Sequence, residues 1–251
     1  MWTWAAASRR GSSHEKSNTR LQDAFSCFVT GESGEFFVGI VSDGAGSAAF
    51  GGEGASLVCR TIGIRIRRHL RAERRLPADD EILTWTDDVR DLLASVAQRR
   101  GAELRDFAST LVCLIASPDD SVALHVGDGS VVIRESGSEN WRAASWPEHG
   151  EYASTTYFMT DDSGLRLRIS RSDKPIEAAS LFSDGLERLA LDFAAKLPFP
   201  RFFNGVMAPV VASQSVGRDG PLSAALKEYL GSPSVLARTD DDTTLILALR
   251  Q

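Results

Sequence analysis

Aspartates lie at the ends of three separate apolar runs in this 251-residue chain. Asp43 ends the run FFVGIVSD, Asp128 ends VALHVGD, Asp184 ends ASLFSD, and a glycine follows each of the three. Asp241, in an acidic triplet, precedes TTLILALR, and Asp23 precedes AFSCFV. Carboxylates gathered at one edge by such strands repel one another unless they are protonated or bind cations. An all-oxygen ligand set suits a hard divalent metal ion, so the pattern indicates a metal-dependent hydrolytic site.

Each Asp-Gly pair has a second interpretation. Asp-Gly is favoured in tight hairpin turns, where glycine accepts a positive φ without strain. Three pairs that each terminate a β-like run nevertheless favour a shared acidic site over three unrelated turns.

The glycine-rich segment 44–55, GAGSAAFGGEGA, superficially matches a dinucleotide-binding fingerprint. The acidic residue that completes this fingerprint about 20 residues later is missing, because an arginine-rich helix is expected there. The alternative is a glycine loop that bends sharply after Asp43, so that a main-chain carbonyl reaches the same cation.

Two basic residues precede Asp23 in the segment SSHEKSNTRLQDAF. His14 titrates near neutrality, and Arg20 offers a planar fork that pairs with phosphate oxygens. Both are therefore candidates for phosphate binding, although most exposed histidines and arginines are simply solvated. The seven basic residues between positions 65 and 75 are interpreted as the solvated face of a helix, with a docking surface for an acidic partner as the alternative.

Composition excludes several classes of protein. The net charge of -6 disfavours a general nucleic-acid or membrane-surface binder, and no apolar segment is long enough to span a bilayer. Three isolated cysteines without CxxC spacing are expected to be reduced core thiols, which places the protein in the cytosol. The length and the 43% hydrophobic content fit a single domain covering residues 1–251.

The pattern of apolar residues predicts an α+β fold. Helices are expected over 51–71 and from 79 to Gly101, because apolar residues recur there at steps of three and four. Strands are expected at 2–8, 24–30, 35–42, 109–116, 121–126, 130–134, 155–159, 165–169, 178–182 and 243–249. The prolines between 188 and 230 predict broken helices. Strands and helices in this order indicate a layered domain without regular βαβ alternation.

Six motifs, in order over nearly the whole chain, resemble those of the metal-dependent type 2C protein Ser/Thr phosphatases. They are QDAF at 22–25, VSDGAGS at 41–47, STLVCLIA at 109–116, VGDGS at 126–130, FSDGLERL at 182–189 and DDTTLILA at 241–248. The segments SHxxxxxxxQDAF and GEYASTTYF at 150–158 are similar to a divergent bacterial branch of that family, which is often associated with Ser/Thr kinases.

This resemblance implies a four-layer α/β/β/α sandwich, in which two antiparallel sheets flanked by helices hold two Mn²⁺ or Mg²⁺ ions. It implies that Asp43 bridges both ions and that the Gly44 carbonyl binds the first. Asp184 and Asp241 would hold the second ion, and Asp23 would fix a metal-bound water. Asp128 matches the residue that with Asp184 can bind a third ion.

The chain departs from the family pattern at three positions. Asn18 occupies the place of the usual phosphate-binding arginine, so Arg20 or His14 would have to substitute for it. Asp242 replaces an asparagine, and Gly129 replaces a serine. The segment between Asp128 and Asp184 is short, which predicts a reduced or missing flap over the site.

The expected activity is hydrolysis of phosphoserine or phosphothreonine on proteins by in-line attack of a metal-activated water. The implied partners are a phosphoprotein substrate and a cognate Ser/Thr kinase, with no nucleic acid and no membrane. Two alternatives stay open: a catalytically weak or inactive regulatory module that binds a kinase or phosphoprotein, and a phosphohydrolase acting on small phosphoesters.

Overall fold

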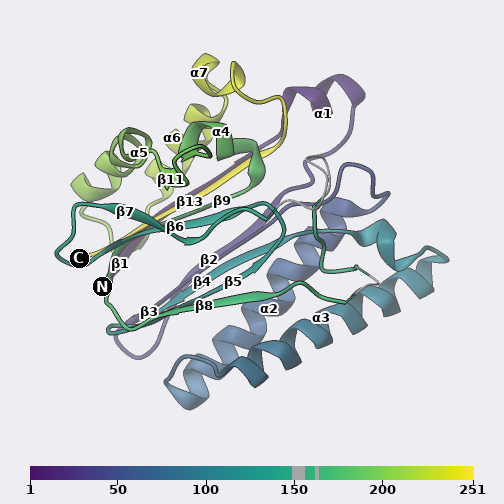
Figure 1. Cartoon of the computed structure of the whole chain (residues 1–251), viewed down its shortest axis with the longest axis horizontal. Coiled ribbons are helices and arrows are strands. Elements are labelled where there is room, and N and C mark those ends of the chain that lie inside the picture. Colours follow the sequence, from purple (N-terminus) through teal and green to yellow (C-terminus); the bar gives the residue numbers. More distant parts are fainter. Residues whose placement is uncertain (149–155, 162–163) are drawn as a thin grey trace.

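Two sheets form the centre of the molecule in a computed structural model that describes residues 1–148, 156–161 and 164–251 (Figure 1). One sheet has the order β12-β1-β13-β9-β6-β7, and the other has the order β2-β3-β4-β5-β8. The strands of the first are Gly217–Arg218 (β12), Trp2–Arg9 (β1), Thr243–Arg250 (β13), Ile176–Phe182 (β9), Ser130–Glu135 (β6) and Trp141–Ser145 (β7). Those of the second are Ala24–Thr30 (β2), Phe36–Ser42 (β3), Leu111–Ala116 (β4), Ser121–Val126 (β5) and Arg168–Ser172 (β8).

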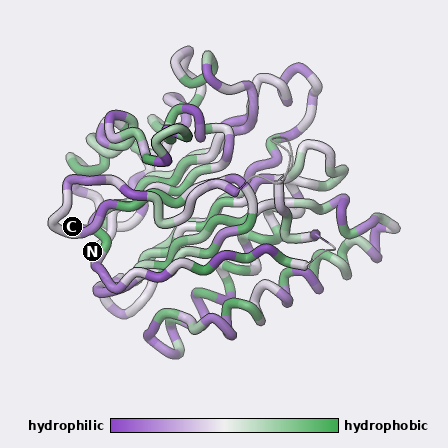
Figure 2. The backbone as a smooth tube through the Cα atoms, viewed as in Figure 1, coloured by the Kyte–Doolittle hydropathy of each residue, from purple (hydrophilic) through white to green (hydrophobic). Residues whose placement is uncertain are grey.

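The facing sides of the two sheets share one apolar cluster. Phe37 and Val41 of β3 belong to it together with Leu181 of β9 and Ile246 of β13, and all four side chains are buried. Central strands covered on both faces contain nearly continuous apolar residues, which explains why 36–42 and 243–249 were recognisable as strands from sequence. Figure 2 shows the hydrophobic residues concentrated along these strands.

Two long helices, Gly51–Glu73 (α2) and Asp79–Arg100 (α3), cover the outer face of the five-stranded sheet. Their apolar stripes pack against residues of β2 to β5, as the predicted periodicity required. The Glu81 carboxylate accepts the Ala78 backbone N–H at 2.7 Å and so caps the start of α3. Gly101 ends α3 in the left-handed conformation, as expected.

The helices Pro200–Ala212 (α5) and Gly220–Leu230 (α6) cover the outer face of the six-stranded sheet. Short helices Glu187–Ala190 (α4) and Pro233–Leu236 (α7) flank them (Figure 1). This confirms the prediction of broken helices between 188 and 230. Pro209 lies inside α5 and does not end it, whereas Pro200 and Pro221 occupy helix starts, where a missing N–H costs nothing.

The structure differs from the predicted elements at several places. The helix Ser12–Ser17 (α1) and strand β7 were not predicted, because each is too short to show a period. The strand expected at 165–169 begins only at Arg168 and continues to Ser172. A strand was predicted at 155–159, and a reduced or missing flap was predicted between Asp128 and Asp184. Residues 149–155 and 162–163 of this segment lie outside the described residues, and residues 157–159 form no strand. No helix in the described part of the chain is long and apolar enough to cross a bilayer.

Candidate metal centre

Four of the predicted aspartates lie at adjoining strand ends of the two sheets. Asp23 directly precedes β2, and Asp43 directly follows β3. The antiparallel pairing of Ala24 with Ser42 therefore places both at the same end of this sheet. In the other sheet Asp184 follows β9 and Asp241 precedes β13, and Phe182 pairs with Leu245. Strand pairing thus gathers residues separated by up to about 200 positions in the sequence.

Asp43, Asp128, Asp184 and Asp241 line a common cavity of about 340 Å³. Asp128, between β5 and β6, connects the two sheets, and the Thr156 hydroxyl donates a hydrogen bond to its Oδ2. Both backbone hydrogen-bonding groups of Asp43 are paired with Thr110. The Asp43 N–H donates to Thr110 Oγ1 at 2.9 Å, and the Asp43 carbonyl accepts the Thr110 N–H at 2.8 Å.

Asp23 is buried beside this cavity and held by two hydroxyl groups. Ser183 Oγ and Thr244 Oγ1 donate to its Oδ2 at 2.8 and 2.6 Å. Burial raises the pKa of Asp23 to about 6, and the two hydroxyl donors counteract part of this rise. Its Oδ1 is buried without a hydrogen-bond partner among the described residues.

The other carboxylates are unfavourable in their charged form. Burial, followed by the charges of Asp23 and Asp184, raises the pKa of Asp43 well above its ordinary value. Burial and the charge of Asp128 raise the pKa of Asp184, and burial raises that of Asp241. Asp184 Oδ1 is buried without a hydrogen-bond partner among the described residues. Crowded, under-coordinated carboxylate oxygens of this kind fit a hard divalent cation.

Two of the glycines after these aspartates are required by close contacts. A Cβ at Gly44 would lie 2.2 Å from the Gly51 carbonyl carbon, and one at Gly185 would lie 2.1 Å from the Asp242 carbonyl oxygen. Neither glycine has a positive φ. The hairpin-turn interpretation is therefore wrong for both pairs. Gly44 instead allows the segment after Asp43 to approach the start of α2, and Gly185 allows the segment after Asp184 to approach Asp242.

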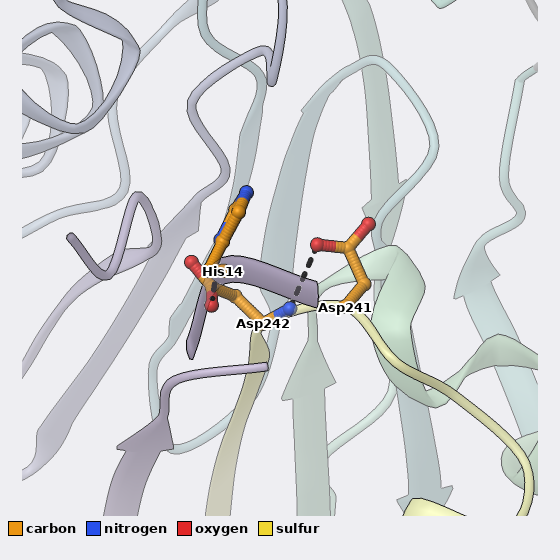
Figure 3. A group of neighbouring side chains, drawn as sticks. All are labelled: His14, Asp241 and Asp242. Atoms are coloured by element: carbon orange, nitrogen blue, oxygen red, sulfur yellow. Dashed lines mark hydrogen bonds and ion pairs between the residues drawn. The ribbon is translucent and has the colours of Figure 1, made fainter. Parts of the chain in front are cut away.

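Asp242, next to Asp241, uses both carboxylate oxygens to hold the backbone. Figure 3 shows it beside His14, with its own N–H donating to Asp241 Oδ1. Its Oδ1 accepts the Gly11 N–H at 2.7 Å and lies 3.0 Å from His14 Nδ1, and its Oδ2 accepts the Gln22 N–H at 2.6 Å. In the described part of the chain, His14, Asp241 and Asp242 are the group whose potential ligand atoms lie within 4.8 Å of one another. We interpret Asp242 as a structural clamp, because neighbouring donors already occupy both of its oxygens.

The candidate phosphate-binding residues lie at the edge of this region. The His14 ring pairs with Asp242, and Arg20 is exposed in the loop before Gln22. Asn18 ends α1 with φ 55°, a left-handed conformation that asparagine tolerates better than arginine does.

Arg188 and Arg238 were missed by the sequence analysis. Together with Asp184, Asp241, Glu187 and Asp240 they line a polar cavity of about 170 Å³. Both guanidinium groups are exposed and have no ion pair among the described residues. Their positions, four residues after Asp184 and three before Asp241, were the available signal, since each is close in sequence to a predicted ligand.

Comparison with known proteins identifies the family. The family model described as Protein phosphatase 2C matches residues 10–231. The chain is 33% identical to serine/threonine-protein phosphatase 3 of Escherichia coli K12, with 99% of this chain and 98% of that protein covered.

Solved structures share the fold. The phosphatase Stp1 from Staphylococcus aureus superposes with a TM-score of 0.64 at 17% identity, covering 100% of this chain and 96% of that one. The catalytic domain of the phosphatase PstP, in complex with two manganese ions, has a TM-score of 0.63 at 15% identity, covering 99% and 97%. The chain belongs to the protein phosphatase 2C family of metal-dependent serine/threonine protein phosphatases.

Proposed function

We propose that residues 1–251 form one domain that removes phosphate from phosphoserine and phosphothreonine of protein substrates at the acidic cavity. The supporting observation is the convergence of four cavity-lining aspartates from both sheets, with the buried Asp23 beside them. The apolar clusters outside and between the sheets support a four-layer α/β/β/α arrangement. Three unpaired cysteines fit a cytosolic location.

The cavity would hold two Mn²⁺ or Mg²⁺ ions. Asp43 and the Gly44 carbonyl would bind the first, Asp184 and Asp241 would share the second with Asp43, and Asp128 would contribute to a third. Bound divalent ions lower the pKa of water and neutralise the charge of phosphoryl oxygens. The raised pKa values of Asp43 and Asp184 support this assignment, because a nearby cation would stabilise their charged forms.

Residues of the chain itself would position the reactants. The two hydroxyl donors to Oδ2 of Asp23 fix its carboxylate, so Oδ1 can accept a hydrogen bond from the attacking water. Arg188 and Arg238 lie next to Asp184 and Asp241, where their guanidinium groups can pair with substrate phosphate oxygens. Arg20 and His14 stay candidates for the same role.

Phosphopeptide hydrolysis with and without Mn²⁺ tests the proposal. We expect EDTA to abolish phosphate release, and Asp43→Asn and Asp184→Ala each to lower kcat/KM by about 100-fold or more. Asp87→Asn, which removes an exposed carboxylate of α3, serves as a matched control and should retain activity. An Asp43→Asn variant as active as the parent protein would refute the assignment. Parallel assays with nucleotides and aryl phosphates would show whether small phosphoesters are the better substrates.

A regulatory module without turnover is a second candidate, because Asn18 removes the usual arginine. Such a module has no need of the under-coordinated carboxylates described above. Isothermal titration calorimetry separates the two possibilities, since the enzyme should bind Mn²⁺ at micromolar to millimolar concentrations and turn over substrate. A protein that binds a phosphopeptide, does not bind Mn²⁺ and does not hydrolyse the phosphopeptide would support the module.

A further inference from the structure

The outer face of α2 carries arginines that the protein does not neutralise. Arg60, Arg67, Arg68 and Arg71 are all exposed, and none has an ion pair or a hydrogen bond among the described residues. The Arg67 guanidinium lies 4.0 Å above the centre of the Phe28 ring, which fixes its direction without cancelling its charge. Four uncompensated cations are unexpected in a chain with a net charge of -6.

Neighbouring arginines behave differently. Arg65 pairs with Asp88 of α3 at 2.9 Å, Arg74 pairs with Glu32 at 2.7 Å and Arg75 pairs with Glu81 at 2.7 Å. The arginines that face α3 and the adjoining loops therefore form ion pairs with carboxylates. None in the described structure serves the stripe formed by Arg60, Arg67, Arg68 and Arg71, which we call the arginine stripe.

Two adjoining surface pockets lie along the arginine stripe, and together we call them the groove. One cavity of about 290 Å³ lies between α2 and β2 and is lined by Phe25, Phe28, Arg60 and Arg67, among others. A second of about 460 Å³ is lined by Arg67, Arg68, Arg71 and Ala72. Both cavities share Ile64, a large apolar residue that is 61% exposed. The groove thus combines positive charge with an apolar floor.

The strand beside this groove has an open edge. β2 is the terminal strand of its sheet among the described strands, and five of its seven residues, Ala24 to Cys27 and Val29, are partly exposed. An edge strand offers unpaired backbone N–H and C=O groups to an added extended segment. Arginines close to such an edge favour a segment of negative charge.

We propose that the arginine stripe and the β2 edge form a docking site for an acidic, extended segment of a partner protein. Arg60 and Arg71 are separated by about 16 Å along the helix axis, which corresponds to about five residues of extended chain. In an extended segment with acidic residues at every second position, one face presents carboxylates to the guanidinium groups, and the methylene groups of the same side chains can contact the exposed Ile64. This assignment goes beyond the proposed hydrolysis and does not depend on it.

A direct binding measurement tests the docking site. The probe is a fluorescently labelled octapeptide of alternating glutamate and valine, with an otherwise identical glutamine peptide for comparison, and the readout is fluorescence anisotropy. We expect the glutamate peptide to bind at least tenfold more tightly than the glutamine peptide, and binding to weaken as salt is raised. The variant Arg60→Gln/Arg67→Gln/Arg71→Gln should lose at least tenfold in affinity.

The matched control removes the same charge elsewhere. Arg99→Gln/Arg105→Gln/Arg201→Gln replaces three exposed arginines outside the groove and should bind the peptide like the parent protein. Thermal melts confirm that both triple variants are folded, and Ile64→Ser tests the apolar floor alone, with an expected loss of a few fold. Equal weakening in both triple variants would show a net-charge effect and overturn the proposal. Tighter binding of a single-stranded oligonucleotide than of the glutamate peptide would also overturn it.

Discussion

Asp242 shows how a single carboxylate can organise a candidate metal centre through backbone hydrogen bonds. It holds backbone N–H groups at Gly11 and Gln22, and the second of these directly precedes Asp23. Asp242 itself lies between Asp241 and the start of β13 at Thr243, so these hydrogen bonds also fix the position of that segment. Candidate ligands from the beginning and the end of the chain are therefore positioned through one buried side chain, which is 1% exposed.

Replacing Asp242 by asparagine, the residue usual in the family, should destabilise this protein. An amide NH₂ group cannot accept an N–H donor, so the Gln22 or the Gly11 N–H would lose its partner in a buried environment. We expect the free energy of unfolding to fall by about 1 to 3 kcal/mol in urea denaturation. Asp240→Asn, an exposed neighbour, should change it by less than about 0.5 kcal/mol. Equal stability of both variants would contradict the role of Asp242 as a clamp.

His125 of β5 predicts a specific pH dependence. Burial, and then the charge of Arg168, lowers the pKa of His125 from its ordinary value of 6.5 to about 3. The imidazole is therefore neutral in the folded protein and becomes protonated in the unfolded chain below pH 6.5. Its contribution to stability is fully present above pH 6.5 and is lost as the pH falls towards 3.

A comparison with His125→Gln isolates this effect, because the aspartates of the cavity titrate alike in both proteins. The difference in unfolding free energy between parent and variant should decrease on acidification by up to about 1.4 kcal/mol per pH unit. Urea denaturation at several pH values between 7 and 4 measures it. A difference that does not vary with pH would show that His125 has the same pKa in the folded and unfolded states, and would contradict the lowered pKa.

Among the structural elements, the loop after β9 depends on the absence of a side chain at Gly185. Gly185→Ala would place a methyl group against the Asp242 carbonyl and force apart the segments that carry Asp184 and Asp241. We expect a loss of stability of about 1 to 3 kcal/mol and weaker Mn²⁺ binding by calorimetry. Gly205→Ala, in a helix where a Cβ would meet no atom within 4 Å, should be neutral or stabilising by up to about 1 kcal/mol. Unchanged Mn²⁺ affinity in Gly185→Ala would contradict the role of this contact.

Elements with a clear period or a long apolar run were predictable from sequence, and contact-dependent features were not. The helices α2 and α3 and the central strands fall within a few residues of their predicted bounds, since burial requires their apolar patterns. The acidic cavity was foreseeable because aspartates mark the strand ends. Three features depend on neighbours that are distant in sequence. They are the steric requirement for glycine at position 185, the hydrogen bonds made by Asp242 and the location of Arg188 at the cavity. No local pattern of residues encodes those contacts.

At the scale of the whole molecule, the candidate metal ligands come from both sheets, so ion binding should hold the sheets together. Asp43 belongs to one sheet, and Asp184 and Asp241 belong to the other. A ligand present at 100 times its dissociation constant adds about 2.7 kcal/mol to the free energy of unfolding. For a chain of this size, Mn²⁺ should raise Tm by about 5 to 10 °C relative to EDTA.

The substitution Asp43→Asn should change the melting temperature in opposite directions in EDTA and in Mn²⁺. In EDTA it should melt above the parent protein, because it removes a buried charge that is repelled by Asp23 and Asp184. In Mn²⁺ it should melt below the parent, because a ligand contributed by the five-stranded sheet is lost. Thermal melts at constant ionic strength measure both shifts, with Asp87→Asn as the control that follows the parent. An equal Mn²⁺ response in Asp43→Asn and the parent would show that the stabilising ion binds elsewhere, and the two sheets would then be held together by their shared apolar cluster alone.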